Sequence, residues 1–341
     1  MKIINVEKIP EIIKKWQNDC EVFVPVDNEG AVDFIPWSEG SKITLEGNSL
    51  VPPKKLFFPQ TETLYKYETK GQSANVIALE EKTAQRIIFG IRPCDLKSLE
   101  MLDDVFLTKG FVDPYYKLKR ENTALVALLC AEACDTCFCT SMNIDPGAAS
   151  GADIVACKSG EQLGLQAQTE KGEELLNKVS QLTTEGEIDF KKAGNFKLQA
   201  DIEGLAEKLK EHFESPYWEA ACRKCIGCGT CTYLCPTCHC FDINSNTRGD
   251  HGIKTRCWDS CMFSEYTLMA GGHNPRPGKK ERFRQRFLHK LQYFPERYNK
   301  TACVGCGRCL AKCPAIVDIT RIITELREVT GIGTGNVESV S

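Results

Sequence analysis

The chain has 341 residues and a nearly balanced charge, with 43 Lys and Arg against 46 Asp and Glu. Its length allows one large domain or two to three smaller ones. The apolar content of 42% and the charged content of 26% are those of an ordinary folded protein, which excludes a disordered or fibrous chain. Because there is no basic excess, we expect no nucleic-acid partner.

Cysteine is the unusual component, with 20 residues. A chain of this length can form a real core without disulfides. The opening MKIINVEKIPEIIKK lacks the apolar segment of a signal peptide, and no apolar run reaches the roughly 20 residues that a membrane span needs. We therefore expect a cytoplasmic protein with metal-bound thiolates and no membrane span.

The first 200 residues alternate between strand-like and helix-like patterns. Short apolar runs predict strands at 21–26, 34–37, 55–58, 86–91, 124–129, 152–156 and 162–169. Helical spacing of apolar residues follows at 95–106, where Asp95 is the expected N-cap, and at 173–179. This alternation predicts a mixed α/β domain over residues 1–200.

Beyond residue 200 we expect helices and no strand. Helical patterns lie at 201–213, 258–269, 278–294 and 318–329. The last residues, 331–341, are expected to form a loose tail.

A repeated cysteine motif lies in this second region. Both copies have the spacing CxxCxxCxxxCP, with cysteines at 225, 228, 231 and 235 and at 303, 306, 309 and 313. This is the spacing of bacterial two-cluster ferredoxins, in which the fourth cysteine ligates the other cluster. The predicted ligands are Cys225, Cys228, Cys231 and Cys313 for one [4Fe–4S] cluster and Cys303, Cys306, Cys309 and Cys235 for the second. The alternative is zinc, which typically uses two CxxC pairs.

The segment between the two motifs has 67 residues, from 236 to 302. Because we expect it to be helical, the region is similar to the α-helical ferredoxin arrangement in iron–sulfur subunits of succinate dehydrogenase-like complexes. The predicted fold class is therefore α+β, with the mixed α/β domain over 1–200 followed by an α-helical ferredoxin-like domain with two clusters over 201–330.

The motif region is locally basic, with 16 Lys and Arg against 6 Asp and Glu over residues 222–313. Much of this charge lies in residues 276–300. We expect a docking surface there, for an acidic partner or a flavin phosphate, with Arg282, Arg284 and Arg286 as contacts. The alternative is a solvated helix face.

A second group of cysteines follows the two strongest strand predictions. Cys94 comes after the strand at 86–91, and four more come after the strand at 124–129, namely Cys130, Cys134, Cys137 and Cys139. Parallel neighbouring strands would bring these thiols together at one sheet edge. Four of the five could hold a third [4Fe–4S] cluster, and the spacing does not choose which four. The alternatives are buried, inert thiols or a radical S-adenosylmethionine site, for which the required run of βα units is missing.

Several segments together resemble one family of iron–sulfur subunits. They include GIRPCDLKSLEMLD at 90–103, DPYY at 113–116, CFCTSM at 137–142, CIGCGTCTYLCPTCHCFD at 225–242, WDSC at 258–261, GHNPR at 272–276 and CVGCGRCLAKCP at 303–314. The family includes iron–sulfur subunits of anaerobic sulfite reductases and the beta subunits of cytosolic sulfhydrogenases. The resemblance implies that Cys94, Cys130, Cys137 and Cys139 bind the third cluster, while Cys134 departs from the family pattern. It also implies that Cys238, Cys240 and Cys261 either pack near the clusters or, with His239, tune one of them by hydrogen bonding.

Motifs for other chemistry are missing from the sequence, which has no clear GxGxxG, P-loop or HExxH pattern. We therefore expect no flavin or nicotinamide bound by this chain alone. The predicted function is electron transfer within an oxidoreductase complex. The electrons would pass between a flavin/NAD(P)H subunit on one side and a terminal catalytic subunit of sulfite reductase, hydrogenase or disulfide reductase type on the other. The alternative is a reductase whose chemistry occurs at the N-terminal cluster.

Overall fold

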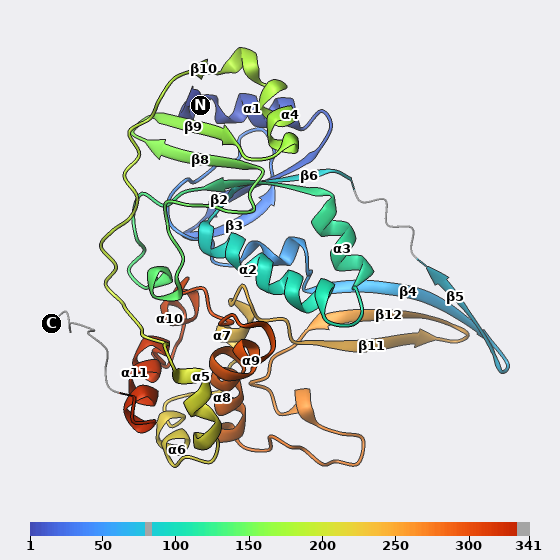
Figure 1. Ribbon diagram of the computed structural model, residues 1–341. Coiled ribbons are helices and arrows are strands. Elements are labelled where there is room, and N and C mark those ends of the chain that lie inside the picture. The colour runs from blue at the N-terminus through green and yellow to red at the C-terminus, as the bar shows by residue number, and fades with distance from the viewer. Residues whose placement is uncertain (79–83, 333–341) are drawn as a thin grey trace.

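The structure is a computed structural model that describes residues 1–78 and 84–332. Its main element is an eight-stranded sheet with the order β10-β1-β9-β8-β7-β6-β2-β3 (Figure 1). The strands are β1 (Lys2–Asn5), β2 (Glu21–Asn28), β3 (Ala31–Pro36), β6 (Arg86–Ile91), β7 (Thr123–Leu128), β8 (Ile154–Ser159), β9 (Gln162–Ala167) and β10 (Thr184–Glu185). Strands β2, β6, β7 and β8 are parallel to one another, and the remaining pairs are antiparallel.

Helices cover both faces of this sheet. Helices α1 (Ile9–Trp16) and α4 (Glu170–Asn177) pack on one face, and α2 (Pro93–Asp103) and α3 (Pro114–Glu121) lie on the other (Figure 1). Because both faces are buried, the central strands are apolar along their whole length, as in TALVAL of β7. This explains why their runs were readable from sequence.

The C-terminal third is mainly helical, and it shares its core with side chains of the N-terminal half, such as Met101, Phe138 and Met142. Its helices are α5 (Leu205–Leu209), α6 (Tyr217–Ala221), α7 (Thr230–Tyr233), α8 (Lys279–Leu288), α9 (Phe294–Tyr298), α10 (Arg308–Ala311) and α11 (Ile319–Val329). Trp218, Phe287 and Ile323 are fully buried in this core. The combination of sheets and helices agrees with the predicted α+β class, and the boundary at residue 200 stays a prediction.

The expectation of no strand after residue 200 is wrong. Strands β11 (Phe241–Arg248) and β12 (His251–Trp258) form an antiparallel hairpin inside the segment that we expected to be helical. Most of β11 is exposed, so its sequence lacks the apolar alternation of a half-buried strand. The readable signal was the two-residue turn, where Gly249 has a φ of +63°.

This hairpin completes a second sheet with an N-terminal hairpin. The order is β11-β12-β4-β5, where β4 spans Thr61–Lys70 and β5 spans Ser73–Ala78. Buried Arg256 of β12 pairs with Glu62 of β4 at 2.5 Å and also with Asp113. Segments from both halves of the sequence therefore build one sheet (Figure 1).

Three smaller expectations also fail. Residues 55–58 are not a strand, because Pro53–Leu56 forms a 3-10 turn that buries Phe57 and Phe58. Residues 258–269 are not a helix, since the side chains of Asp259 and Ser260 accept hydrogen bonds from nearby backbone N–H groups. Asp95 is not an N-cap, because the N-cap position of α2 is Arg92.

Within residues 1–78 and 84–332, no helix is both long and apolar enough to cross a membrane. The expected tail lies mostly outside the described residues, which end at 332.

Candidate metal centres

The first predicted ligand set lines one cavity of the helical region. Cys225, Cys228 and Cys231 surround it with Cys313, which belongs to the other motif. Two of these sulfurs accept backbone hydrogen bonds, Cys225 Sγ from Gly227 at 3.4 Å and Cys313 Sγ from Val317 at 3.3 Å. The fold thus brings the fourth cysteine of one motif to the three of the other, and its role as a ligand stays a prediction.

The second predicted set lines a neighbouring cavity. Its thiols are Cys235, Cys303, Cys306 and Cys309. The loop that carries the last three needs glycine at 305 and 307, which have φ values of +59° and +74°. A Cβ at either position would lie 2.6 Å or less from the backbone of residues 136–139. These glycines therefore allow close packing against the N-terminal half as well as the tight loop.

Buried cations face both thiol sets. Lys290 Nζ lies 3.1 Å from Cys235 Sγ, and Arg286 lines both cavities. Although burial opposes it, the nearby side chains of Cys231 and Cys309 raise the pKa of Arg286 above its ordinary value. Arg286 Nε has no hydrogen-bond partner among the described residues. Thiolate ligands and a [4Fe–4S] cluster together carry negative charge, which would compensate this buried guanidinium, so the residues present fit such a group.

The thiols of the second set differ in protonation. Burial raises the pKa of Cys303 and Cys306 to about 11 and that of Cys309 to about 12. By contrast, a hydrogen bond with the Cys238 thiol, together with Lys290 and Lys54, holds the pKa of Cys235 well below its ordinary value. Ligation needs thiolates, so cluster assembly on the first three would release protons.

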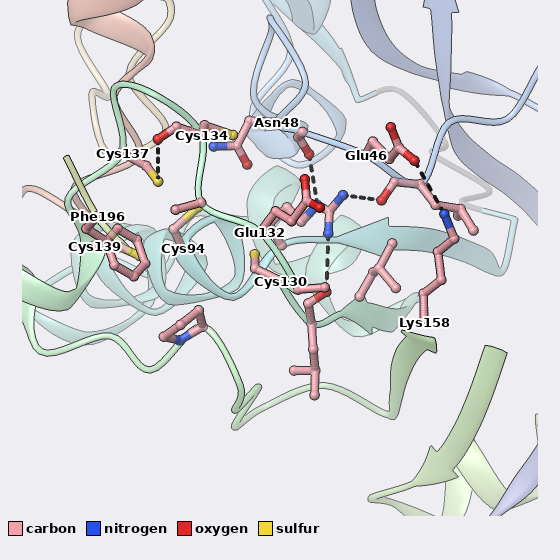
Figure 2. A pocket seen from close by; sticks show the side chains of 18 residues that line it. Glu46, Asn48, Cys94, Cys130, Glu132, Cys134, Cys137, Cys139, Lys158 and Phe196 are labelled. Carbon is pink, nitrogen blue, oxygen red and sulfur yellow. Dashed lines mark hydrogen bonds and ion pairs between the residues drawn. The ribbon is translucent and has the colours of Figure 1, made fainter. Parts of the chain in front are cut away.

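A third cavity lies at the sheet edge, as Figure 2 shows. It has a volume of about 130 Å³, and its lining includes Cys94, Cys130, Cys134, Cys137 and Cys139. We call it the N-terminal cysteine cavity. Strands β6 and β7 are parallel neighbours, and Cys94 and Cys130 follow their carboxyl ends as expected.

All five thiols of this cavity remain candidates. The Cys137 thiol donates to the Cys134 carbonyl at 3.2 Å (Figure 2), and a hydrogen bond from Cys137 lowers the pKa of Cys134 to about 6. Burial raises the pKa of Cys139 to about 11 and that of Cys94 well above its ordinary value. The assignment of Cys94, Cys130, Cys137 and Cys139 as ligands therefore stays a prediction, with Cys134 close beside them.

Two contacts join this cavity to the second thiol set. The Phe138 N–H donates to the Gly305 carbonyl at 2.7 Å. Behind the thiols, Arg308 makes two 2.7 Å contacts with the Asp95 carboxylate, and both side chains are buried. The residue expected to cap a helix instead connects the two cysteine regions.

The prediction of a docking surface at 276–300 is wrong for the three arginines that were expected to make the contacts. Arg284 and Arg286 are buried, and Arg282 donates to the carbonyls of Met262, Arg276 and Pro277. The three side chains point in different directions. Arg286 lines the thiol cavities, whereas Arg284 donates to the Phe213 carbonyl and pairs with Glu214.

The remaining cysteines of the CPTCHC and WDSC segments lie beside the second thiol set. The Cys238 thiol is hydrogen-bonded to Cys235, and the Cys240 thiol is hydrogen-bonded to Cys261 and Tyr266. His239 is partly buried and contacts the Thr237 carbonyl at 3.0 Å through Nδ1. Packing close to a predicted ligand is consistent with either of the expected roles.

Sequence reasoning missed Lys54, which is buried and donates to the Cys238 carbonyl at 2.8 Å. It also missed Asn48, which donates to the Cys306 carbonyl at 3.3 Å. Both come from a loop-rich N-terminal segment far from the motifs in sequence, and no local pattern marks them. In the described part of the chain, no three His, Cys, Asp or Glu side chains are grouped as ligands of a single metal ion.

Comparisons with known proteins relate the chain to iron–sulfur proteins. A family model described as a 4Fe-4S dicluster domain matches residues 224–317. The chain is 31% identical over 334 residues to sulfhydrogenase 2 subunit beta of Pyrococcus furiosus, which covers 94% of this chain and 97% of the relative. No solved structure matches the chain significantly.

Proposed function

The chain belongs to the family of iron–sulfur subunits that includes sulfhydrogenase beta subunits, and we propose that it is the electron-transfer subunit of a hydrogenase-type oxidoreductase complex. The observation that carries this proposal is the pair of crossed thiol sets around Arg286. A bound [4Fe–4S] cluster supplies reversible one-electron transfer. Cys225, Cys228, Cys231 and Cys313 would hold one cluster, and Cys303, Cys306, Cys309 and Cys235 a second.

A third cluster at the N-terminal cysteine cavity is the finer part of the proposal. Cys94, Cys130, Cys137 and Cys139 would be its ligands, because they line one cavity. The Phe138–Gly305 hydrogen bond and the Asp95–Arg308 pair hold this cavity against the second thiol set. Three neighbouring sites in one chain suit a protein that carries electrons across its own length.

The chain's other residues provide the conditions for such carriers. Apolar side chains, including Phe138 and Phe283, exclude water from between the thiols. Lys290, Arg286 and Lys54 keep positive charge beside the second set, which favours the more negative, reduced state of a bound cluster.

The complex should contain two further components, a flavin/NAD(P)H subunit together with a terminal catalytic subunit. A hydride donor delivers two electrons together, while a cluster accepts one, so a flavin is needed to separate the pair. The flavin subunit would therefore supply single electrons to this chain. The relative's name suggests hydrogen turnover as the reaction of the terminal subunit.

Anaerobic purification and reduction kinetics test this proposal. The isolated chain should contain about eight irons with two clusters and about twelve with three. Dithionite should reduce it, while NAD(P)H should not until the flavoprotein is added. Fast reduction of the flavin-free chain by NAD(P)H, or stoichiometric zinc in place of iron, would contradict the proposed electron-transfer role.

A reductase acting at the N-terminal cysteine cavity is the second candidate. The observation in its favour is a cavity of about 130 Å³ with one thiol more than a cluster needs. Substrate turnover distinguishes the two candidate functions, because an isolated electron carrier reduces dyes but converts no substrate. Multiple-turnover reduction of sulfite or a disulfide by the isolated, dithionite-fed chain, abolished in Cys134→Ser, would favour the reductase.

A further inference from the structure

The eight thiols of the two motifs are unequally accessible. Cys228 is the exposed one, Cys306 is buried, and the remaining six are partly buried. The first thiol set therefore reaches the protein surface at Cys228. Electrons pass between proteins where a carrier comes close to the surface, so the surroundings of Cys228 are where a redox partner would make contact.

Two exposed isoleucines flank this point. Ile226, between Cys225 and Cys228, is 68% exposed, and Ile316, just after Cys313, is 76% exposed. Ile226 and Pro314 border the same cavity as Cys228. Large apolar side chains at such exposure have no role in the core, and interfaces are where they typically become buried.

The backbone of Ile316 adds an independent sign. Its φ is +52°, in the left-handed region that β-branched residues avoid. A conformational cost of this kind persists at functional positions when the surrounding structure enforces it. Here the strained backbone presents an apolar side chain to solvent beside the first thiol set.

The segments around these isoleucines are mainly basic, with Asp318, the N-cap residue of α11, as the nearest acidic residue in sequence to Ile316. Lys224 directly precedes Cys225, Lys312 directly precedes Cys313, and both are exposed together with Arg223. Residues 222–235 and 303–317 contain no Asp or Glu. The three cations form no ion pair with another residue in the described part of the chain, so their charge is available to a partner.

We propose that this surface, comprising Ile226, Ile316, Arg223, Lys224 and Lys312 around Cys228, docks a redox protein whose contact face is apolar at its centre and acidic at its rim. The proposal rests on the proposed electron-transfer function and replaces the docking surface expected at 276–300. On docking, one electron passes between the partner's carrier and the cluster held by the first thiol set; one is oxidised, the other is reduced, and no bond is broken. Complementary charge would speed the encounter, and burial of the isoleucines would hold the complex together.

Reduced flavodoxin, an acidic one-electron donor, is a suitable probe for the full-length, cluster-loaded chain. The wild-type rate of reduction, measured anaerobically by stopped flow, should fall as salt rises. Lys224→Glu with Lys312→Glu should lower that rate about tenfold or more at low salt and remove most of its salt dependence. Ile316→Asn should also lower it several-fold, and because Asn tolerates positive φ, misfolding would not explain the loss.

Two matched controls change residues that are not part of this surface. Lys191→Glu reverses the charge of an exposed lysine, and Val76→Asn removes an apolar side chain that is 61% exposed. Both should keep the wild-type rate with flavodoxin. Reduction by dithionite and the EPR spectra should be unchanged in every variant, which separates loss of docking from loss of clusters.

Three outcomes would overturn the docking proposal. They are an unchanged flavodoxin rate in the variants, a wild-type chain that dithionite reduces but flavodoxin does not, and a dimer of this chain that Ile316→Asn dissociates, which would make the surface a contact between copies. A chain with no dithionite-reducible clusters would instead refute the proposed function itself.

Discussion

The N-terminal cysteine cavity and the helical region both contain groups of thiols, but they differ in the positive charge that lies beside those thiols. In the helical region, Lys290, Arg286 and Lys54 are buried and lie beside thiols or the backbone that carries them. At the N-terminal cavity, Arg92 donates to three backbone carbonyls, and Arg308 is paired with Asp95. The helical region therefore has three buried cations beside its thiols, whereas at the N-terminal cavity Arg92 is the cation that acts on Cys130 and the charge of Arg308 is balanced by a carboxylate.

This difference has an expected electrical consequence. A cation near a cluster stabilises its more negative, reduced state and raises its reduction potential. We expect the clusters of the helical region to have higher potentials than one at the N-terminal cavity. If so, electrons would pass spontaneously from the N-terminal cavity towards Cys228.

The largest effect should come from breaking the crossed ligand sets, because they make the helical region one unit. Cys313→Ser should disturb the cluster bound by Cys225, Cys228 and Cys231, although it lies in the other motif. EPR spectra of the reduced proteins would show this. The spectrum of Cys313→Ser should match that of Cys228→Ser and differ from that of Cys306→Ser.

Cys222→Ser is the matched control, since Cys222 is buried close to the first set and is expected to bind no cluster. A Cys313→Ser spectrum that instead matches Cys306→Ser would mean that each motif serves its own cluster.

The next effect concerns the pair that joins the two regions. Arg308→Met should destabilise the protein by about 3–5 kcal/mol, because it leaves the buried Asp95 carboxylate without its partner. Asp95→Asn in the same chain should recover part of the loss. Urea unfolding followed by circular dichroism measures both.

The exposed pair Lys192–Asp145 provides a comparison, and Lys192→Met there should cost no more than about 1 kcal/mol. An equally small cost for Arg308→Met would show that the two regions are held together by other contacts.

A pH effect on stability should follow from two partly buried histidines in the helical region. Burial lowers the pKa of His239 to about 4 and that of His289 to about 3, so both are neutral in the folded protein at pH 6, while in the unfolded chain they begin to protonate near pH 6.5. The unfolded state then binds more protons, and stability should fall as pH drops from 6.5 towards 4. It should not change through these groups above pH 6.5. The slope is up to about 1.4 kcal/mol per pH unit for each histidine.

His289→Phe should reduce this slope between pH 6.5 and 5, and His251→Gln, at an exposed position, should not. Equal slopes in wild type and His289→Phe would show that His289 protonates without cost in the folded state.

The smallest expected effect is on the reduction potential of a single cluster in the helical region. Lys290→Gln removes the charge 3.1 Å from Cys235 Sγ but keeps a hydrogen-bond donor. It should lower the potential of the cluster bound by the second set by tens of millivolts, where about 59 mV is a tenfold change in equilibrium constant. EPR-monitored redox titration measures it, with Lys300→Gln as control because Lys300 pairs with Asp104 instead. A reduction potential within error of the wild-type value would show that the charge of Lys290 does not influence this cluster.

The sequence predicted features that depend on local spacing. The cysteine motifs, the buried strands β6 and β7 and their parallel pairing all follow from patterns within a few residues, together with the rule for parallel sheet edges. The hairpin β11–β12 was missed because its strands are mainly polar and because β12 is stabilised by pairing with the distant strand β4. Tertiary packing decides that Arg286 and Lys290 point inward. It also brings Lys54 and Asp95 close to the cysteine regions, and the periodicity of a single sequence does not predict such long-range contacts.

The pairing of β4 with β12 also determines how long β4 lacks its partner strand while the chain is being synthesised. Their registered residues, such as Thr61 and Cys257, are separated by roughly 190 residues of chain. At 5–20 residues per second, about 10–40 s pass on the ribosome before β4 can meet its partner. During that time the hairpin β4–β5 has an unpaired edge, which other strands can join. Newly made chains should therefore be most prone to aggregation before residue 258 has emerged, and slowed translation of the segment between the two hairpins should lower the yield of folded protein.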